Sequence, residues 1–302
     1  MYIVHGLDKD GTALPLVYAL LPNKQESSYM RFFEALASRM DDDGFGKHVV
    51  VDFEENPIKA IKLAFPRSEV FGCIFHLSKS IQRNMSSDLN DRYDDDTLTE
   101  IQIRRLAALS FLPPSEVQSM FETIKRKLPR DDEEMLSLYS YFERTYIGTI
   151  SHAPNYAVQL WNSYYRVLND IPRTSNYAES FNRKLNGDAA CDHPSIWNFI
   201  ELLRLQQHTT DRHVAQGRAG PINLRRAEQL RIDRRLKELV SKYDSAVFTE
   251  EQKLKYLDCC CFALVSYSKK KTLEKRTSAQ HIMPRLLPIY DALTQTLDIV
   301  DN

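Results

Sequence analysis

The spacing of the apolar residues changes near residue 90, and this change limits the fold more than any other feature of the sequence. Before it, apolar, β-branched and aromatic residues form short runs typical of strands, at Tyr2–His5, Leu14–Leu20, His48–Phe53 and Glu69–Phe75. The pair Asp10-Gly11 is a turn signal between the first two runs. Helical spacing fills the later gaps, at 27–40, 56–65 and 76–89. A hairpin followed by alternating helices and strands predicts an α/β fold.

Beyond residue 90 the pattern is helical. Stripes with a period of 3.6 residues begin at Val117, Met135 and Tyr156, so residues 91–171 are predicted to be a helical block. Ser175 or Asn176 is placed to cap the next helix, and Pro194 to open another. Residues 214–302 are charged and predicted to be helical, with three lysines at 269–271.

The charge balance excludes a strongly basic nucleic-acid coat and a long acidic tail, because the 302 residues carry a net charge of −1. The balance differs between the two parts of the chain: it is −6 over residues 1–172 and +5 over residues 173–302. This split is either ordinary scatter or a basic surface for phosphate. No apolar run of about 18 residues is present, so we expect no membrane span, and the first residues do not resemble a secretory signal. Five cysteines, three of them adjacent at 259–261, favour a reducing, intracellular compartment.

Two carboxylates stand out from the pattern. Asp52 ends the run His48–Phe53, and the C-terminal tip of a buried strand is where open α/β sheets place functional groups. The alternative is an Asp that caps the following turn. Glu54 beside it is a weaker candidate. Periodicity alone makes Glu179 an ordinary surface residue of a predicted helix.

Cys73 and His76 have the spacing of half a zinc site, since thiolate and imidazole are both zinc ligands. A complete site needs a second pair, for which Cys191, His193 and His152 are the candidates. The alternative is core packing of Cys73, with His76 as a helix cap, and we expect this alternative rather than zinc.

A series of short motifs resembles the Mutator-like element (MULE) family of DDE transposases. No single motif is specific, but they follow the family's order over roughly residues 1–208. They are Pro15-Leu-Val-Tyr-Ala-Leu-Leu-Pro-Asn-Lys24, Tyr29-x2-Phe-Phe33, Val51-Asp-Phe-Glu54, Phe65-Pro66, Gly72-Cys-Ile-Phe-His76, Phe111-Leu-Pro113, Tyr141-Phe-Glu143 with Tyr146-Ile-Gly148, Trp161-Asn162, Pro172-Arg-Thr174 and His193-Pro-Ser-Ile-Trp197.

The resemblance implies a ribonuclease H-like core whose carboxylates hold two divalent metals, Mg²⁺ or Mn²⁺, for cleavage and strand transfer of DNA. By the match, Asp52 is the second acid and Glu179 the third, and we expect their carboxylates to lie within about 8 Å of each other, as ligands of metals roughly 4 Å apart. Cys73 and His76 match the family's C-x2-H signature. Trp161 is a candidate for stacking on an unpaired base, or else a core residue.

One departure from the family limits the expected activity. The family's first Asp lies on a strand just upstream of the segment that Tyr2–His5 resembles, and the sequence begins within that segment. Asp8 and Asp10 do not replace it, because they belong to the predicted turn. We therefore expect a core without its first strand, from a truncated gene model or a degenerate remnant.

The resemblance also implies the organisation and partners of the chain. Residues 1–213 are expected to form the transposase-like domain, with the helical insertion at 91–171, and residues 214–302 a helical, basic region. DNA at transposon ends is the expected partner and the nucleus the expected location, and a homo-oligomer is compatible with the family. The alternatives are a non-catalytic DNA- or protein-binding remnant and a helical scaffold.

Overall fold

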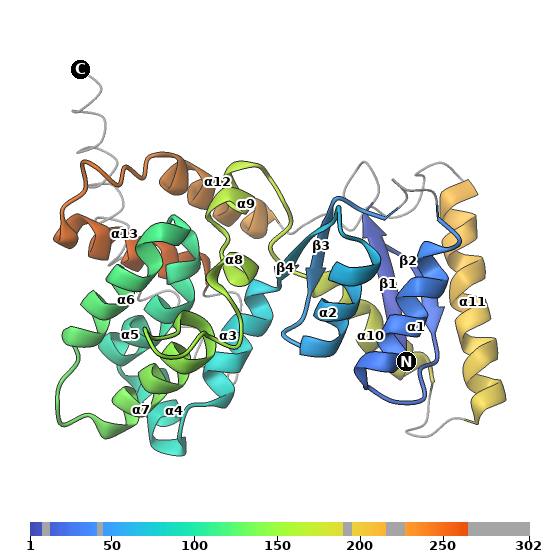
Figure 1. Ribbon diagram of the computed structural model, residues 1–302, viewed down its shortest axis with the longest axis horizontal. Coiled ribbons are helices and arrows are strands. Elements are labelled where there is room, and N and C mark those ends of the chain that lie inside the picture. Colours follow the sequence, from blue (N-terminus) through green and yellow to red (C-terminus); the bar gives the residue numbers. More distant parts are fainter. Residues whose placement is uncertain (8–12, 41–44, 190–194, 216–226, 265–302) are drawn as a thin grey trace. The chain divides into compact units, whose positions relative to one another are not determined.

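The computed structural model describes residues 1–7, 13–40, 45–189, 195–215 and 227–264. These residues divide into two compact units, each assembled from two separate stretches of chain (Figure 1). The first unit contains residues 1–70 and 175–227, and the second contains residues 71–174 and those from 228 onward.

A β-hairpin opens the first unit. Strand β1 (Tyr2–Leu7) pairs antiparallel with β2 (Ala13–Ala19), with Tyr2 opposite Ala19 and Leu7 opposite Ala13. The register shifts between Val4 and His5, because Val4 lies opposite Val17 and His5 opposite Pro15. Leu16 is therefore the extra residue of a β-bulge.

The second strand pair follows a helix that packs through aromatic residues. Helix α1 (Glu26–Ala37) buries Tyr29 and Phe33, and both rings meet Tyr2 of β1 edge to face. Strand β3 (His48–Val51) is then joined through α2 (Glu55–Ala64) to β4 (Glu69–Gly72), with which it pairs. Among the described residues, β1–β2 and β3–β4 are two separate sheets.

The first unit is completed by two helices from much later in the sequence. Helix α10 (Asn176–Asp188) meets the hairpin through Phe181, whose ring lies 5.2 Å from that of His5 and 6.3 Å from that of Tyr18. Helix α11 (Ile196–Ala215) runs along β2 and buries Leu203 (Figure 1).

In its described part the second unit is built from helices, apart from the end of β4. The α-helices are α3 (Ile74–Arg83), α4 (Ser87–Asp95), α5 (Thr97–Ala108), α6 (Val117–Arg126), α7 (Glu133–Phe142), α8 (Val158–Trp161), α9 (Tyr164–Leu168), α12 (Ala227–Ser241) and α13 (Glu250–Ala263). Two short 3₁₀ helices, η1 (Leu109–Phe111) and η2 (Pro114–Glu116), and a π-helical turn, η3 (Glu143–Ile147), link some of them. Helix α5 lies at the centre, packed on α3, α4 and α13, and its Arg105 forms an ion pair with Asp258 of α13 at 2.7 Å.

The described residues confirm an α/β-type chain that is mostly helical with small sheets. Strands occur at all four predicted runs, and helices make up most of the predicted block 91–171. The predicted strand 69–75 is too long, because α3 already begins at Ile74. No described helix has the length and apolar character needed to cross a bilayer.

Several predictions fall outside the described residues. These are the turn with Asp8, Asp10 and Gly11, the opening of a helix by Pro194, and most of the region 214–302 with its lysines at 269–271. The domain boundary between residues 213 and 214 stays a prediction. It rests on the family resemblance, whereas the two compact units are defined by packing.

Candidate functional site

Asp52 lies directly after β3, as the sequence pattern predicts. Its backbone carbonyl accepts a hydrogen bond from the amide of Glu54 at 2.8 Å, which turns the chain toward α2. The side chains of Asp52 and Glu54 are both exposed. The tip of this strand thus presents two carboxylates to solvent.

Glu54 is held by its neighbours. Its Oε1 accepts a hydrogen bond from Lys24 Nζ at 2.9 Å, and its Oε2 accepts one from the Tyr29 hydroxyl at 3.4 Å. This contact raises the pKa of the Lys24 ammonium above its ordinary value, because Glu54 favours the charged form. Glu54 therefore acts with Lys24 in an ion pair that joins the start of α1 to the tip of β3.

Tyr2 is the aromatic neighbour of both acids. Burial raises the pKa of its hydroxyl well above the ordinary value, and the charges of Tyr29, Asp52 and Glu54 raise it further. Tyr2, Lys24 and Tyr29 were not among the predicted site residues. The sequence carried a signal only for Lys24 and Tyr29, which stand in the motifs that led to the family resemblance.

Glu179 lies in the first turn of α10, where a negative charge favours the helix dipole. The helix is fixed against the hairpin by Tyr177 and Phe181, and Leu185 is buried behind them. The Glu179 side chain is half-buried. Asp52 and Glu179 therefore belong to the same compact unit, and their convergence within about 8 Å stays a prediction.

The described residues do not make up the three-carboxylate site that the family resemblance implies. Within the described ranges no three His, Cys, Asp or Glu side chains gather closely enough to hold a metal ion. Asp52 and Glu179 are two oxygen donors of the kind that Mg²⁺ prefers, and that ion relies on water and phosphate for the rest of its shell. The family's first Asp has no counterpart among the described residues, so these ranges contain two of the three acids that the resemblance implies.

Cys73 and His76 occupy the junction of β4 and α3. Cys73 is the N-terminal cap residue of α3 and its side chain is fully buried, as the packing alternative predicts. His76 lies in the first turn with its ring edge to face against Phe75 at 5.5 Å, and the cap has no side-chain hydrogen bond. The prediction that His76 caps this helix is therefore wrong.

The second half of a zinc site is not found near this pair in the described chain. His152 is exposed, and its Nδ1 lies 2.9 Å from the hydroxyl of Ser151. Cys191 and His193 lie outside the described residues.

Trp161 is a core residue, as the second of its two predicted alternatives has it, and not a base-stacking side chain. Its side chain is 1% exposed, and its indole N–H donates a hydrogen bond to the backbone carbonyl of Tyr146 at 3.0 Å. The rings of Phe142 and Tyr146 lie edge to face against it. A base could not reach its ring faces without opening this core.

A family model of the MULE transposase domain matches residues 1–80. The match includes Asp52, Cys73 and His76 and ends before Glu179 and Trp161. No curated protein and no solved structure matches the chain. The match supports a transposase-derived function and an interaction with DNA by resemblance.

Proposed function

We propose that the first unit is a ribonuclease H-like transposase core that binds DNA and is catalytically incomplete. The observation that carries this proposal is the position of Asp52, directly after β3, within the segment that the transposase domain matches. Transposon ends are the DNA partner that the resemblance supports, and the nucleus is the compartment in which such DNA is found.

The strand arrangement supports a ribonuclease H-like core. An antiparallel hairpin is followed by β3 and β4, which are joined by a helix, and the two strand pairs remain separate in the described residues. A further strand between β1 and β3 would join the pairs into one sheet and satisfy their facing backbone groups. The family resemblance implies a strand that carries an Asp at that position.

Asp52 and Glu179 are the proposed metal residues. A divalent cation, when bound, would supply positive charge near a DNA phosphate. Two carboxylates without the family's first acid would hold it weakly. We expect Mn²⁺ to bind at millimolar concentration, and Asp52→Asn and Glu179→Gln each to weaken it. Paramagnetic broadening of the proton NMR spectrum measures this, with Glu54→Gln as the control for a neighbouring acid engaged by Lys24.

The decisive experiment is an end-labelled duplex assay on four proteins. They are the 302-residue chain, the same chain extended before Met1 by a strand-forming segment that carries an Asp, and the extended chain with Asp52→Asn or with Glu179→Gln. We expect the first to bind DNA with marked salt dependence and not to cut it, the second to nick DNA with Mg²⁺ or Mn²⁺, and both substitutions to abolish nicking. Nicking by the extended chain that survives both substitutions would place the catalytic centre elsewhere.

The second candidate function is a non-catalytic DNA- or protein-binding remnant. The lack of a three-acid cluster in the described ranges favours it. In this case DNA binding persists, while the extended chain gains neither Mn²⁺ affinity nor nicking.

A further inference from the structure

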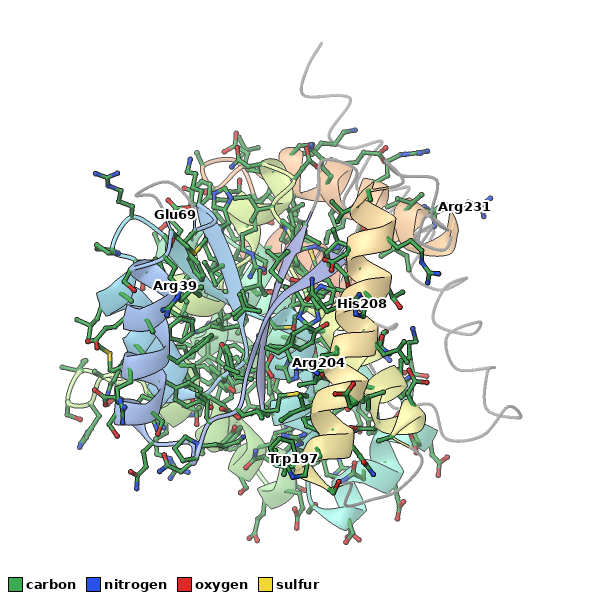
Figure 2. The ribbon with its side chains drawn as sticks, turned by 90° about the vertical axis from the view of Figure 1, so that its right-hand side faces the viewer. Arg39, Glu69, Trp197, Arg204, His208 and Arg231 are labelled. Atoms are coloured by element: carbon green, nitrogen blue, oxygen red, sulfur yellow. The ribbon has the colours of Figure 1, made fainter. Side chains whose placement is uncertain are left out.

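The outer face of α11 presents an unusual set of exposed side chains. Trp197 is 74% exposed and Leu205 is 61% exposed, and Arg204 and His208 follow Trp197 along the helix (Figure 2). The opposite face packs toward β2 and buries residues that include Leu203, Gln206 and Thr210. Large exposed aromatic side chains are characteristic of protein interfaces.

Five exposed residues form one stripe along this face, which we call the α11 stripe. Their spacing of four, three, four and four residues keeps them on one side of the helix over about 22 Å. They are Trp197, Glu201, Arg204, His208 and Arg212.

The α11 stripe is complementary to itself when a second copy lies antiparallel. A two-fold axis that passes between Arg204 and Leu205 places Glu201 opposite His208 of the other copy. The same axis places Trp197 opposite Arg212, an arrangement that gives a cation–π contact at each end. Leu205 then lies opposite Arg204 of the other copy, against the aliphatic stem of that side chain.

The charges of this face favour a protein partner over nucleic acid. Arg204 Nη1 forms an ion pair with Glu201 Oε1 at 2.9 Å, so a carboxylate lies directly beside this guanidinium. Asp211, also exposed, accepts a hydrogen bond from Gln207 at 2.6 Å and adds a second acid. A surface that carries two carboxylates among its basic residues attracts phosphate less than a purely basic surface does, and it matches a surface of the same composition.

We propose that a second copy of this chain docks on the α11 stripe in an antiparallel, two-fold arrangement. The contact is isologous, because each copy supplies the same residues. A single pair of helices forms a small interface, so the dimer has a Kd on the order of 10–100 µM.

Sedimentation equilibrium of the full chain between about 1 and 200 µM tests the proposal. We expect the mean mass to rise toward that of two chains over this range. Glu201→Lys alone and His208→Glu alone should each weaken dimerisation at least tenfold, because the first removes the carboxylate opposite His208 and the second places two carboxylates opposite each other. The double variant Glu201→Lys/His208→Glu should restore it, because the pair is reversed and not removed.

The control is Arg39→Glu, an exposed charge reversal on the turn after α1, which should leave the dimer unchanged. A chain that stays monomeric over the whole range would overturn the proposal, as would a double variant no better than the single ones. Retention of a labelled duplex that Arg212→Glu abolishes, with the mass of one chain at every concentration, would assign this face to nucleic acid instead. The cleavage assay above does not depend on this face, so the two proposals can fail separately.

Discussion

Arg166 joins the beginning and the end of residues 71–174, the first stretch of the second unit. The side chain is 1% exposed, and its guanidinium donates hydrogen bonds to the backbone carbonyls of Gly72, at 2.8 Å, and Pro172. The ring of Phe71 lies 4.9 Å from the guanidinium carbon. The amide of Ile74 donates to the carbonyl of Arg173 at 3.0 Å, so the same two stretches are also joined directly.

Arg166→Lys should lower the free energy of unfolding by about 2–4 kcal/mol, because one ammonium cannot reproduce a planar fork that reaches two carbonyls. Urea denaturation followed by far-UV circular dichroism measures the loss. The matched control is Arg126→Lys, whose side chain is 70% exposed and should cost less than about 0.5 kcal/mol. Equal effects of the two substitutions would contradict the role assigned to Arg166.

His5 should make the stability of the first unit fall at low pH. Its ring packs against Tyr177 and Phe181, and its Nε2 has no hydrogen-bond partner among the described residues. Burial lowers the pKa of His5 to about 4, so the folded chain keeps the ring neutral.

Between pH 6.5 and about 4 the unfolded chain binds a proton at His5 that the folded chain does not bind. Stability should therefore fall as the pH is lowered through this window, by roughly 1–2 kcal/mol once partial solvent exposure is allowed for. His5→Phe keeps an aromatic ring at this place and should remove that part of the slope in urea titrations at pH 7, 6, 5 and 4.5. The exposed His152→Gln serves as the control, and an unchanged slope in His5→Phe would refute the assignment.

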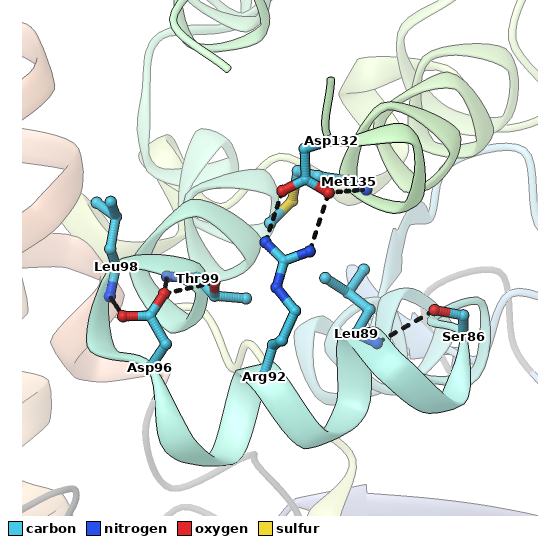
Figure 3. A network of polar contacts seen from close by, with 8 residues as sticks. All are labelled: Ser86, Leu89, Arg92, Asp96, Leu98, Thr99, Asp132 and Met135. Carbon is cyan, nitrogen blue, oxygen red and sulfur yellow. Dashed lines mark hydrogen bonds and ion pairs between the residues drawn. The ribbon is translucent and has the colours of Figure 1, made fainter. Parts of the chain in front are cut away.

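At the scale of elements, three helices of the second unit, α4, α5 and α7, begin at residues with capping side chains (Figure 3). Ser86 caps α4 by accepting from the amide of Leu89, and Asp96 caps α5 by accepting from the amides of Leu98 and Thr99. Asp132 caps α7 through the amide of Met135 and also accepts two hydrogen bonds from Arg92 of α4, at 3.0 and 2.6 Å. Asp132 thus fixes both the start of α7 and its position beside α4.

Asp132→Asn should lower the free energy of unfolding by about 1 kcal/mol and Asp132→Ala by about 2 kcal/mol. Asn retains the helix cap and loses only the charged pair with Arg92, whereas Ala loses both. Asp96→Asn, which affects a cap without an Arg partner, should cost only a few tenths of a kcal/mol and is the control. The Arg92 guanidinium lowers the pKa of the Asp132 carboxyl, so its contribution is present above the ordinary Asp pKa and is lost as the pH falls. In thermal melts, the difference in midpoint between the unsubstituted chain and Asp132→Asn should become smaller below pH 4. A difference that stays constant would argue against the charged pair.

The sequence predicted elements better than their ends. The stripe that begins at Tyr156 indicated one helix, but the chain forms α8 and α9 with a break at Asn162. Asn162 donates to the carbonyl of Leu112 at 2.8 Å, and the amide of Ser163 donates to the carbonyl of Ser110 at 2.6 Å. Periodicity carries no information about such long-range bonds.

The candidate site was predictable only in part for the same reason. The position of Asp52 after a strand follows from local pattern, so the sequence located it. Its neighbours Tyr2 and Lys24 come from other elements, and their approach depends on how the hairpin and α1 pack. The burial of Trp161 also depends on residues from other elements, such as Phe142 of α7.

At the scale of the whole molecule, each unit has its own buried core. Phe33, Ile61 and Leu185 are buried in the first unit, and Phe121, Tyr139 and Leu257 in the second. Compact units with separate cores commonly unfold as separate cooperative transitions.

Differential scanning calorimetry should therefore resolve two transitions. Phe33→Leu should lower one midpoint and Phe121→Leu the other, each by several degrees, because each substitution leaves a cavity in only one core. The exposed Leu63→Ala is the control and should move neither midpoint by more than about 1–2 °C. A single transition that both core variants shift equally would show that the two cores unfold together.

The interleaving of the two units also constrains how the chain is made. A ribosome adds about 5–20 residues per second, so synthesis of residues 71–174 separates the two stretches of the first unit by roughly 5–20 s. During that time α10 and α11 have not yet been made. The apolar faces of the hairpin, α1 and the strand pair that these two helices cover are therefore exposed. The second unit likewise waits for α12 and α13, because these helices follow α11 in the chain. Neither unit can therefore finish folding before the growing chain has passed residue 174. Until then the first stretch is open to chaperones that bind uncovered apolar surface.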